Sequence, residues 1–251
     1  MIEFKALLID LDGVIYVENE LVPGAVEALA RIRRRGIPYR FLTNTSTRGR
    51  AGLVAKLAGY GIPADTSHII CPPYAAARYL RSLGSPRCAV FARPDALREF
   101  DGLPLVEAGA EWLVLGDLED DWTFARMNHA LRLLLGGAQL IALGMTRYWR
   151  ASDGMRLDVG PFAAALTYAT GVQPLVLGKP DAGFFRLAVE DMQARPEDAA
   201  MIGDDVLTDI AGAQSAGLRG ILVRTGKFKP SDLGGPTCPD EIVNSIAELP
   251  V

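Results

Sequence analysis

Two aspartates lie one residue apart near the start of the chain, at the end of a short apolar run. In the stretch "KALLIDLDGVIYVEN" they are Asp10 and Asp12, and Gly13 follows them directly. A single aspartate at this point would be an ordinary turn former or helix cap. Two carboxylates on alternate residues, with a glycine behind them, raise the question of which cation or which reaction needs them there.

More polar side chains follow other apolar runs along the chain. They are Thr43 and Asn44 in "FLTNTS", Lys179 in "VLGKPD", and Asp204, Asp205 and Asp209 in "GDDVLTDI". In open parallel sheets, ligands bind at the carboxyl ends of the strands. If these runs are strands of one parallel sheet, their ends bring several carboxylates, a hydroxyl and an amine to a single edge.

Such a group of side chains is suited to phosphate chemistry. Carboxylates that are held together repel one another, so the cluster calls for a cation. Oxygen ligands without His or Cys favour a hard ion, and Mg²⁺ is the usual choice for phosphate chemistry. A divalent ion and a lysine would neutralise the oxygens of a phosphoryl group, and a free carboxylate beside them can attack phosphorus.

Each of these residues also has an ordinary structural explanation. Thr43 and Asn44 could cap the helix that follows them, and Lys179 could be a solvated loop residue. Asp204 and Asp205 could be polar residues at the end of a strand. The joint pattern is much less expected by chance than any one of its members, and it therefore favours a site.

The elements that must position these residues alternate between strand and helix. Short apolar runs such as "FKALLID" and "IPYRFLT" predict buried strands, and segments such as "PGAVEALARIRRRG" predict the helices between them. This order is typical of a parallel sheet, and it predicts an α/β protein with a Rossmann-like core. The pattern changes over residues 81–173, which we expect to form an inserted α/β domain, with residues 1–80 and 174–251 forming the core.

Composition limits the classes of function. The chain has 251 residues, 49% of them hydrophobic, and a net charge of −4, which argues against a nucleic-acid-binding protein. Its three cysteines are not closely paired, which favours a reducing compartment over a zinc cluster or a disulfide framework. No apolar run approaches the roughly 18 residues of a membrane span, and the start of the chain carries no secretory signal. We therefore expect a cytoplasmic protein that binds neither nucleic acid nor membrane.

Four motifs together resemble those of the haloacid dehalogenase (HAD) superfamily of hydrolases. They are "DLDGVIY", "FLTNTS", "GKPD" and "GDDVLTDI", in this order and at these intervals, and the resemblance covers essentially the whole chain. The insert between the second and third motifs resembles the C2-type cap domain of the NagD-like subfamily. Its stretch "TRYWRASDGMRLDVGPFAAALTYATG" is most similar to the phospholysine/phosphohistidine/inorganic pyrophosphate phosphatase group.

The resemblance implies a role for each residue of the first two motifs. Asp10 would be the nucleophile that forms an aspartyl phosphate, and also a Mg²⁺ ligand. Asp12 would bind the metal through its backbone carbonyl, while its side chain would protonate the leaving group and then deprotonate the attacking water. Gly13 would let the backbone turn away without a side chain in the site. Thr43 and the backbone of Asn44 would hold the phosphoryl oxygens.

The third and fourth motifs complete the site that the resemblance implies. Lys179 would pair with the nucleophile and the phosphate. Asp204 would be a direct metal ligand, and Asp205 and Asp209 would be direct or outer ligands. The chain is thus expected to be a Mg²⁺-dependent phosphatase that acts on a small phosphorylated metabolite.

Two other functions remain as alternatives. One is a phosphomutase or another phosphoryl transferase of the same superfamily, and the other is a non-catalytic Rossmann-type binding protein. No G-x-G-x-x-G sequence follows the first strand, so a dinucleotide-binding protein would lack its phosphate cradle. Relatives often dimerise through caps of this type, and "WLVLG" and residues 122–135 offer apolar faces that burial in the core explains equally well. A homodimer through the cap is therefore left open.

Overall fold

The chain folds as two compact units, each of which is described by itself. The computed structural model describes residues 4–151 and 153–250. The first unit comprises Met1–Thr43, Val54–Ile70 and Lys179–Val251, and the second comprises Asn44–Leu53 and Cys71–Gly178. Most of the second unit is therefore a single insertion into the sequence of the first.

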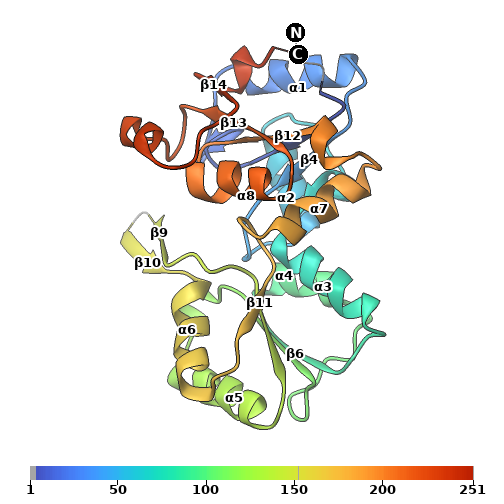
Figure 1. Cartoon of the computed structure of the whole chain (residues 1–251). Helices are drawn as coiled ribbons and strands as arrows, with labels where there is room; N and C mark the ends of the chain where they lie inside the picture. Colours follow the sequence, from blue (N-terminus) through green and yellow to red (C-terminus); the bar gives the residue numbers. More distant parts are fainter. Residues whose placement is uncertain (1–3, 152, 251) are drawn as a thin grey trace. The chain divides into compact units, whose positions relative to one another are not determined.

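A six-stranded parallel sheet forms the centre of the first unit (Figure 1). Its strands are β1 (Ala6–Ile9), β4 (Tyr39–Leu42), β5 (Ile69–Ile70), β12 (Ala199–Gly203), β13 (Arg219–Val223) and β14 (Glu241–Val243). Every residue of β1 and β12 is buried. Continuous apolar runs are typical of parallel strands that are covered on both faces, which is why the sequence predicts these strands well.

The strand order is that of a Rossmann-like fold. It runs β14-β13-β12-β1-β4-β5, so the chain winds outward from β1 through β4 and β5 and then returns to β12 on the other side of β1. The direction of winding reverses between β1 and β12, and ligands of open α/β sheets bind at the carboxyl ends of the strands at such a point. The predicted α/β class with a Rossmann-like parallel sheet is confirmed.

Helices and short turns connect the strands of this sheet. The helices are α1 (Ala25–Arg34), α2 (Arg50–Gly59), α7 (Ala182–Asp191) and α8 (Ala211–Ser215); the turns are η1 (Thr66–His68), η4 (Pro196–Asp198), η5 (Val206–Ile210), η6 (Pro230–Gly234) and η7 (Ile246–Glu248); a small hairpin joins β2 (Tyr16–Val17) to β3 (Glu20–Leu21). Helix α7 packs against β1 and β4, and α8 packs against α7 and β13. These two helices therefore pack against β1 and β13, the strands on either side of β12.

The second unit contains its own four-stranded parallel sheet, in the order β11-β8-β7-β6 (Figure 1). Its strands are β6 (Cys88–Phe91), β7 (Trp112–Leu115), β8 (Gln139–Ala142) and β11 (Pro174–Val176); its helices and turns are α3 (Pro72–Ser82), α4 (Pro94–Leu97), η2 (Arg98–Phe100), η3 (Glu119–Asp121), α5 (Phe124–Leu135) and α6 (Val159–Thr170). A separate antiparallel hairpin is formed by β9 (Tyr148–Ala151) and β10 (Gly154–Leu157).

Alternate residues of β7 enter two different cores in the second unit. Leu113 and Leu115 pack with the apolar residues of α5 and α6, whereas Trp112 and Val114 pack with those of α3. This separation follows from the twofold alternation of side chains along a strand. The sheet is therefore covered by helices on both faces.

Two expectations about the insert need correction. The strand at Pro174–Val176 is expected in the core sheet, but it pairs with β8 in the sheet of the second unit. Helix α3 is likewise expected in the core, yet it packs in the second unit. The local sequence of a three-residue apolar strand or of an alanine-rich helix does not indicate which sheet the segment joins, because that depends on partners far along the chain.

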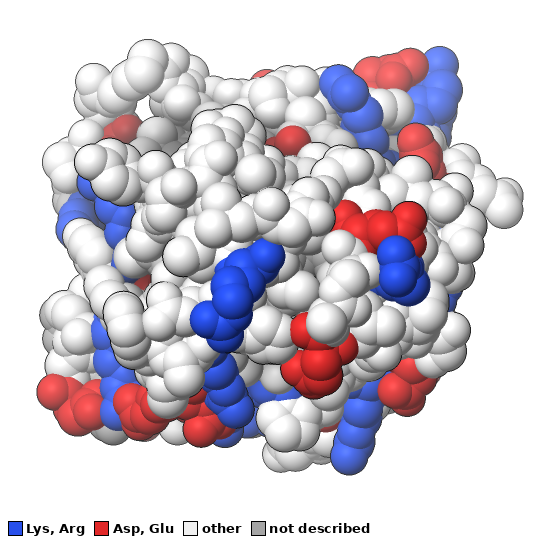
Figure 2. Space-filling view, turned by 90° about the horizontal axis from the view of Figure 1, so that it is seen from below, with Lys and Arg blue, Asp and Glu red and all other residues white. Residues whose placement is uncertain are grey.

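The surface carries charges of both signs. On the face drawn in Figure 2, acidic and basic side chains are interspersed, and uncharged residues cover most of the remaining area. No helix among the described residues has both the length and the apolar character that a membrane crossing requires.

Candidate active site

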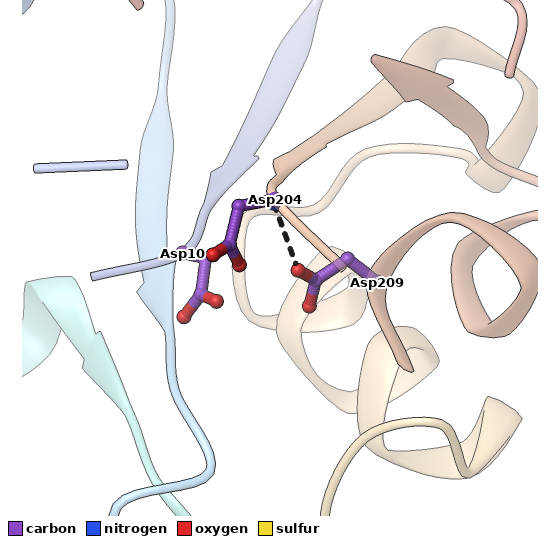
Figure 3. Close-up of side chains that lie close together, drawn as sticks. All are labelled: Asp10, Asp204 and Asp209. Atoms are coloured by element: carbon purple, nitrogen blue, oxygen red, sulfur yellow. Dashed lines mark hydrogen bonds between the residues drawn. The ribbon is translucent and has the colours of Figure 1, made fainter. Parts of the chain in front are cut away.

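Two carboxylates lie close together where the winding of the first sheet reverses (Figure 3). Asp10 follows β1 and Asp204 follows β12, and in these paired strands Ile9 lies opposite Ile202. The backbone N–H of Asp10 donates to the carbonyl of Ile202 at 2.9 Å, so the pairing continues to the strand ends. Both side chains are buried, with 7% of Asp10 and 1% of Asp204 exposed. Strand pairing thus brings together two acidic residues from opposite ends of the chain.

Lys179 lies between two carboxylates. Its Nζ is 2.8 Å from Oδ1 of Asp10 and 2.7 Å from Oδ1 of Asp209. The lysine precedes α7, whose first turn is capped by Asp181: the carboxylate accepts a hydrogen bond from the N–H of Phe184 at 3.1 Å. The capped start of α7 therefore fixes the lysine beside the strand ends.

Asp205 and Asp209 are held by the turn that follows β12. Asp205 caps the π-helical turn η5, because its Oδ1 accepts from the N–H groups of Leu207 and Thr208 at 2.9 and 3.0 Å. Oδ2 of Asp209 accepts from the N–H groups of Asp204 and Asp205, each at 3.1 Å. Figure 3 shows the first of these bonds as a dashed line. Single π turns occur frequently at functional sites, and here the turn directs Asp209 back toward β12.

The cluster holds an excess of negative charge. Three buried carboxylates, those of Asp10, Asp204 and Asp209, face one buried ammonium group, that of Lys179. Burial raises the pKa of Asp10 well above its ordinary value; Lys179 opposes this rise, and Asp209 and Asp204 add to it. Burial and the neighbouring Asp209 raise the pKa of Asp204 to about 6. Burial opposes the charge of Lys179, but Asp10 and Asp209 outweigh it and hold the pKa of the lysine above its ordinary value.

This arrangement fits a hard divalent cation. One carboxylate oxygen from each of Asp10, Asp204 and Asp209 lies within 4.8 Å of the others. Oδ1 of Asp204 and Oδ1 of Asp209 are both buried without a hydrogen-bond partner among the described residues, but Oδ1 of Asp209 forms an ion pair with Lys179. The oxygens of Asp209, by contrast, already accept from two N–H groups and pair with Lys179. The donor set is all oxygen, which Mg²⁺ prefers, and the free oxygen belongs to Asp204.

Gly13 leaves room for the carboxylate of Asp204. Its φ is +88°, in the left-handed region, and a Cβ at this position would overlap Oδ2 of Asp204. The Asp12 that precedes it is exposed, and its side chain is not part of the buried cluster. The first motif therefore places one carboxylate inside the cluster and the other outside it.

The two residues of the second motif fall in different units. Thr43 follows β4, the neighbour of β1, and is 1% exposed. Asn44 begins the first segment of the second unit, where its Oδ1 lies 3.1 Å from the place that a Cβ of Gly178 would occupy. Helix α2 begins only at Arg50, so neither residue is its cap.

A further loop contacts the cluster, although none of the four sequence motifs includes it. It consists of Thr225, Gly226 and Lys227, and it begins two residues after the end of β13, the neighbour of β12. The N–H of Lys227 donates to Oδ2 of Asp204 at 2.6 Å, and Oγ1 of Thr225 donates to the carbonyl of Gly13. The same rule about strand ends would have found the loop had it been applied to the fifth strand of the core.

We expect Lys179→Met to lower the stability of the fold substantially. The change leaves buried carboxylates facing one another without their counter-charge, and breaking a buried ion pair in this way costs about 3 kcal/mol or more. Chemical denaturation at pH 7, without divalent ions, measures the change in the free energy of unfolding.

Lys5→Met is the matched control for this measurement. Lys5 pairs with Asp198 at 3.2 Å, but its side chain is 67% exposed, and exposed ion pairs contribute little. Equal denaturation midpoints for the two variants would contradict the interpretation that Lys179 compensates the buried cluster.

Family models and curated relatives match the chain along most of its length. A model of haloacid dehalogenase-like hydrolases matches residues 7–105, and a HAD-hydrolase-like model matches residues 176–249. A phospholysine phosphohistidine inorganic pyrophosphate phosphatase from Xenopus laevis is 37% identical over 251 residues, with 97% of this chain and 92% of the relative covered. A haloacid dehalogenase-like hydrolase domain-containing protein 2 from Mus musculus is 40% identical over 228 residues, with 91% and 87% covered.

Solved structures resemble the whole chain. A p-nitrophenyl phosphatase from Archaeoglobus fulgidus has a TM-score of 0.92 at 30% identity, with 98% of this chain and 97% of that one covered. NagD from E. coli has a TM-score of 0.91 at 28% identity, with 98% of each covered. A glycerol phosphate phosphatase from Mycobacterium tuberculosis, solved in complex with magnesium, has a TM-score of 0.87 at 28% identity, with 97% and 75% covered.

The chain belongs to the haloacid dehalogenase-like hydrolases. Within that family it is a phosphatase of the NagD-like kind, and the class of enzyme predicted from the sequence is confirmed.

Proposed function

We propose that this phosphatase hydrolyses a small phosphorylated molecule in a Mg²⁺-dependent reaction that passes through a phosphoryl group on Asp10. The observation that carries the proposal is the buried cluster of Asp10, Asp204 and Asp209 around Lys179 at the strand ends. In the first step an oxygen of Asp10 forms a bond to phosphorus, and the bond to the leaving oxygen breaks. In the second step a water oxygen replaces Asp10 on phosphorus, which releases phosphate and restores the carboxylate.

Asp10, Asp204 and the backbone carbonyl of Asp12 would hold the metal ion. When bound, Mg²⁺ neutralises negative charge on the phosphoryl oxygens and on the cluster. The unpartnered oxygen of Asp204 supports this assignment, because a buried acceptor without a partner is costly. Asp209 has both oxygens engaged and acts instead by holding Lys179 and the backbone of Asp204.

Lys179 has two tasks in this proposal. It favours the charged form of Asp10, which attacks phosphorus, because its ammonium lies 2.8 Å from Oδ1 and opposes the effect of burial on the pKa of this carboxyl. It also supplies positive charge to the phosphoryl oxygens. The hydroxyl of Thr43 and the backbone N–H of Asn44 would donate hydrogen bonds to the same oxygens.

Asp12 is the acid and base of the two steps. Its exposed carboxyl lies two residues beyond the nucleophile, outside the buried cluster, so it does not compete for the metal. In the first step it gives a proton to the leaving oxygen, and in the second it takes a proton from the attacking water. Asp12 thus gives one proton and takes one proton in each turnover, so it ends in the protonation state in which it began.

Hydrolysis of p-nitrophenyl phosphate tests the proposal. The purified chain is expected to release p-nitrophenol with added Mg²⁺, to lose about 100-fold or more of this rate with EDTA, and to recover it when Mg²⁺ is returned in excess. The loss is large because the cluster without its cation repels an anionic substrate. Equal rates with Mg²⁺ and with EDTA would contradict the cofactor assignment. Binding of phosphate esters without any turnover would favour the non-catalytic alternative.

A further inference from the structure

The loop Thr225–Lys227 contacts both turns that carry the candidate metal ligands. It follows β13, and Thr225 is half-buried. On one side, Oγ1 of Thr225 donates a hydrogen bond to the carbonyl of Gly13. On the other side, the N–H of Lys227 donates to Oδ2 of Asp204 at 2.6 Å. Three residues of one loop therefore connect the turn after β1 to the turn after β12.

The bond from Lys227 determines which oxygen of Asp204 is available. Oδ2 accepts from the backbone of the loop, whereas Oδ1 is buried and has no hydrogen-bond partner among residues 4–151 and 153–250. The donor is a backbone group, and the side chain of Lys227 is 69% exposed. Side-chain chemistry of the lysine is therefore not needed to orient Asp204.

Gly226 allows the loop to approach this closely. Its φ is +63°, and a Cβ at this position would overlap Oδ2 of Asp204 and lie 2.5 Å from Cα of Gly13. Only a glycine fits both the left-handed backbone and the space. The two glycines thus bring the loop, the turn after β1 and Asp204 into direct contact.

The hydroxyl of Thr225 is the side-chain group that joins the loop to the turn after β1. Its acceptor, the carbonyl of Gly13, belongs to the residue directly after Asp12. The N–H of Gly13 is already engaged, since it donates to the carbonyl of Tyr16 at 2.7 Å. The N–H of Gly13 belongs to the peptide that carries the carbonyl of Asp12, and the carbonyl of Gly13 belongs to the next peptide, so the two bonds together hold both peptides that flank Gly13.

We propose that Thr225 is a positioning residue for the metal site: its hydroxyl fixes the Asp12–Gly13 turn against the free oxygen of Asp204. This inference rests on the proposed function, in which the carbonyl of Asp12 and Asp204 hold Mg²⁺. Groups that orient metal ligands in this way typically alter metal affinity 10- to 100-fold when they are removed. A threonine that only anchored the loop would change stability and leave the affinity for Mg²⁺ as it is.

The test compares Thr225→Val, which keeps the shape and loses the donor, with Thr225→Ser, which keeps the donor. Isothermal titration of Mg²⁺ into the protein without substrate measures the dissociation constant directly. We expect Thr225→Val to weaken Mg²⁺ binding about 10-fold, and Thr225→Ser to bind as the wild type does. Thermal melting with and without Mg²⁺ is expected to show a smaller metal-dependent rise for Thr225→Val.

Thr170→Val is the matched control. Thr170 also donates through Oγ1 to a backbone carbonyl, that of Leu166 at 2.8 Å, but it lies in α6 of the second unit. The Thr170→Val variant is expected to have a lower melting temperature and an unchanged affinity for Mg²⁺. Should Thr225→Val fail to fold, Thr225→Ala and Thr225→Ser, which differ by the hydroxyl, make the same comparison.

Wild-type affinity for Mg²⁺ in the folded Thr225→Val or Thr225→Ala variant would overturn the proposal, as would a wild-type protein that binds no Mg²⁺. A failure of the proposed reaction alone is a different result: the wild-type protein would bind Mg²⁺, and Thr225→Val would bind it more weakly, yet the wild-type protein would hydrolyse no phosphate ester. Titration without substrate and the p-nitrophenyl phosphate assay therefore separate the two.

Discussion

Asp10→Asn is expected to lose about 10⁴-fold or more of the wild-type kcat while its fold stays intact, because the amide is nearly isosteric with the carboxylate but cannot form the bond to phosphorus. The melting temperature of Asp10→Asn should not fall at neutral pH. The buried position raises the pKa of Asp10, so its charged form is disfavoured in the folded protein. A neutral group there removes repulsion from Asp204 and Asp209, at the expense of the contact with Lys179.

Two measurements check the result for Asp10. The first is steady-state turnover of an aryl phosphate, with Asp101→Asn, in an exposed turn, as the control for a generic loss of carboxylate. The second is a rapid acid quench with substrate labelled at phosphorus, which should trap a phosphoenzyme in the wild type and in the control but not in Asp10→Asn. Turnover of Asp10→Asn within tenfold of the wild type would rule out this residue as the nucleophile.

Asp12→Asn is expected to lose roughly 10²- to 10⁴-fold in kcat, the range typical for removal of a general acid or base. Its affinity for Mg²⁺ should stay close to that of the wild type, because the proposed ligand is the backbone carbonyl. The loss should depend on the substrate. An aryl phosphate has a good leaving group that needs little protonation, whereas an alkyl phosphate depends on the acid in the first step.

The second step provides a further readout for Asp12. If the variant still forms the phosphoenzyme from an aryl phosphate but cannot activate water, it should release one equivalent of phenol in a rapid burst and then turn over slowly. Pre-steady-state release of p-nitrophenol measures the burst, and titration of Mg²⁺ without substrate checks the metal site. Equal losses for aryl and alkyl phosphates would count against a role for Asp12 at the leaving group.

The buried strands of the first sheet could be predicted, because each has a pattern within a short stretch of sequence. A buried parallel strand must be apolar over its length, and a polar residue marks its end, so β1, β4, β12 and β13 can be recognised locally. The ends of parallel strands meet at one edge, and from this rule alone Asp10, Thr43 and Asp204 become candidates for one site. The family resemblance adds roles, but the list of candidates rests on strand ends.

The sheet that each segment joins could not be predicted in the same way. The strand at Pro174–Val176 has the same apolar character as the core strands, yet it pairs with β8 in the second unit. Strand pairing is decided by partners far along the chain and by the cover that helices provide. A run of three apolar residues indicates neither its strand partner nor the helices that will cover it.

The direction of the acidic side chains was also decided by tertiary structure. Asp205 and Asp209 are alike in type and separated by one turn of chain, but the π turn η5 directs the first to its own backbone and the second to Lys179. The sequence does not mark the loop that orients Asp204 either. The loop acts through a backbone N–H, a hydroxyl and the absence of a Cβ at Gly226. Composition and spacing determine which residues reach the edge of the sheet, whereas the dihedral angles of the turns and the packing of neighbouring strands determine which atoms meet there.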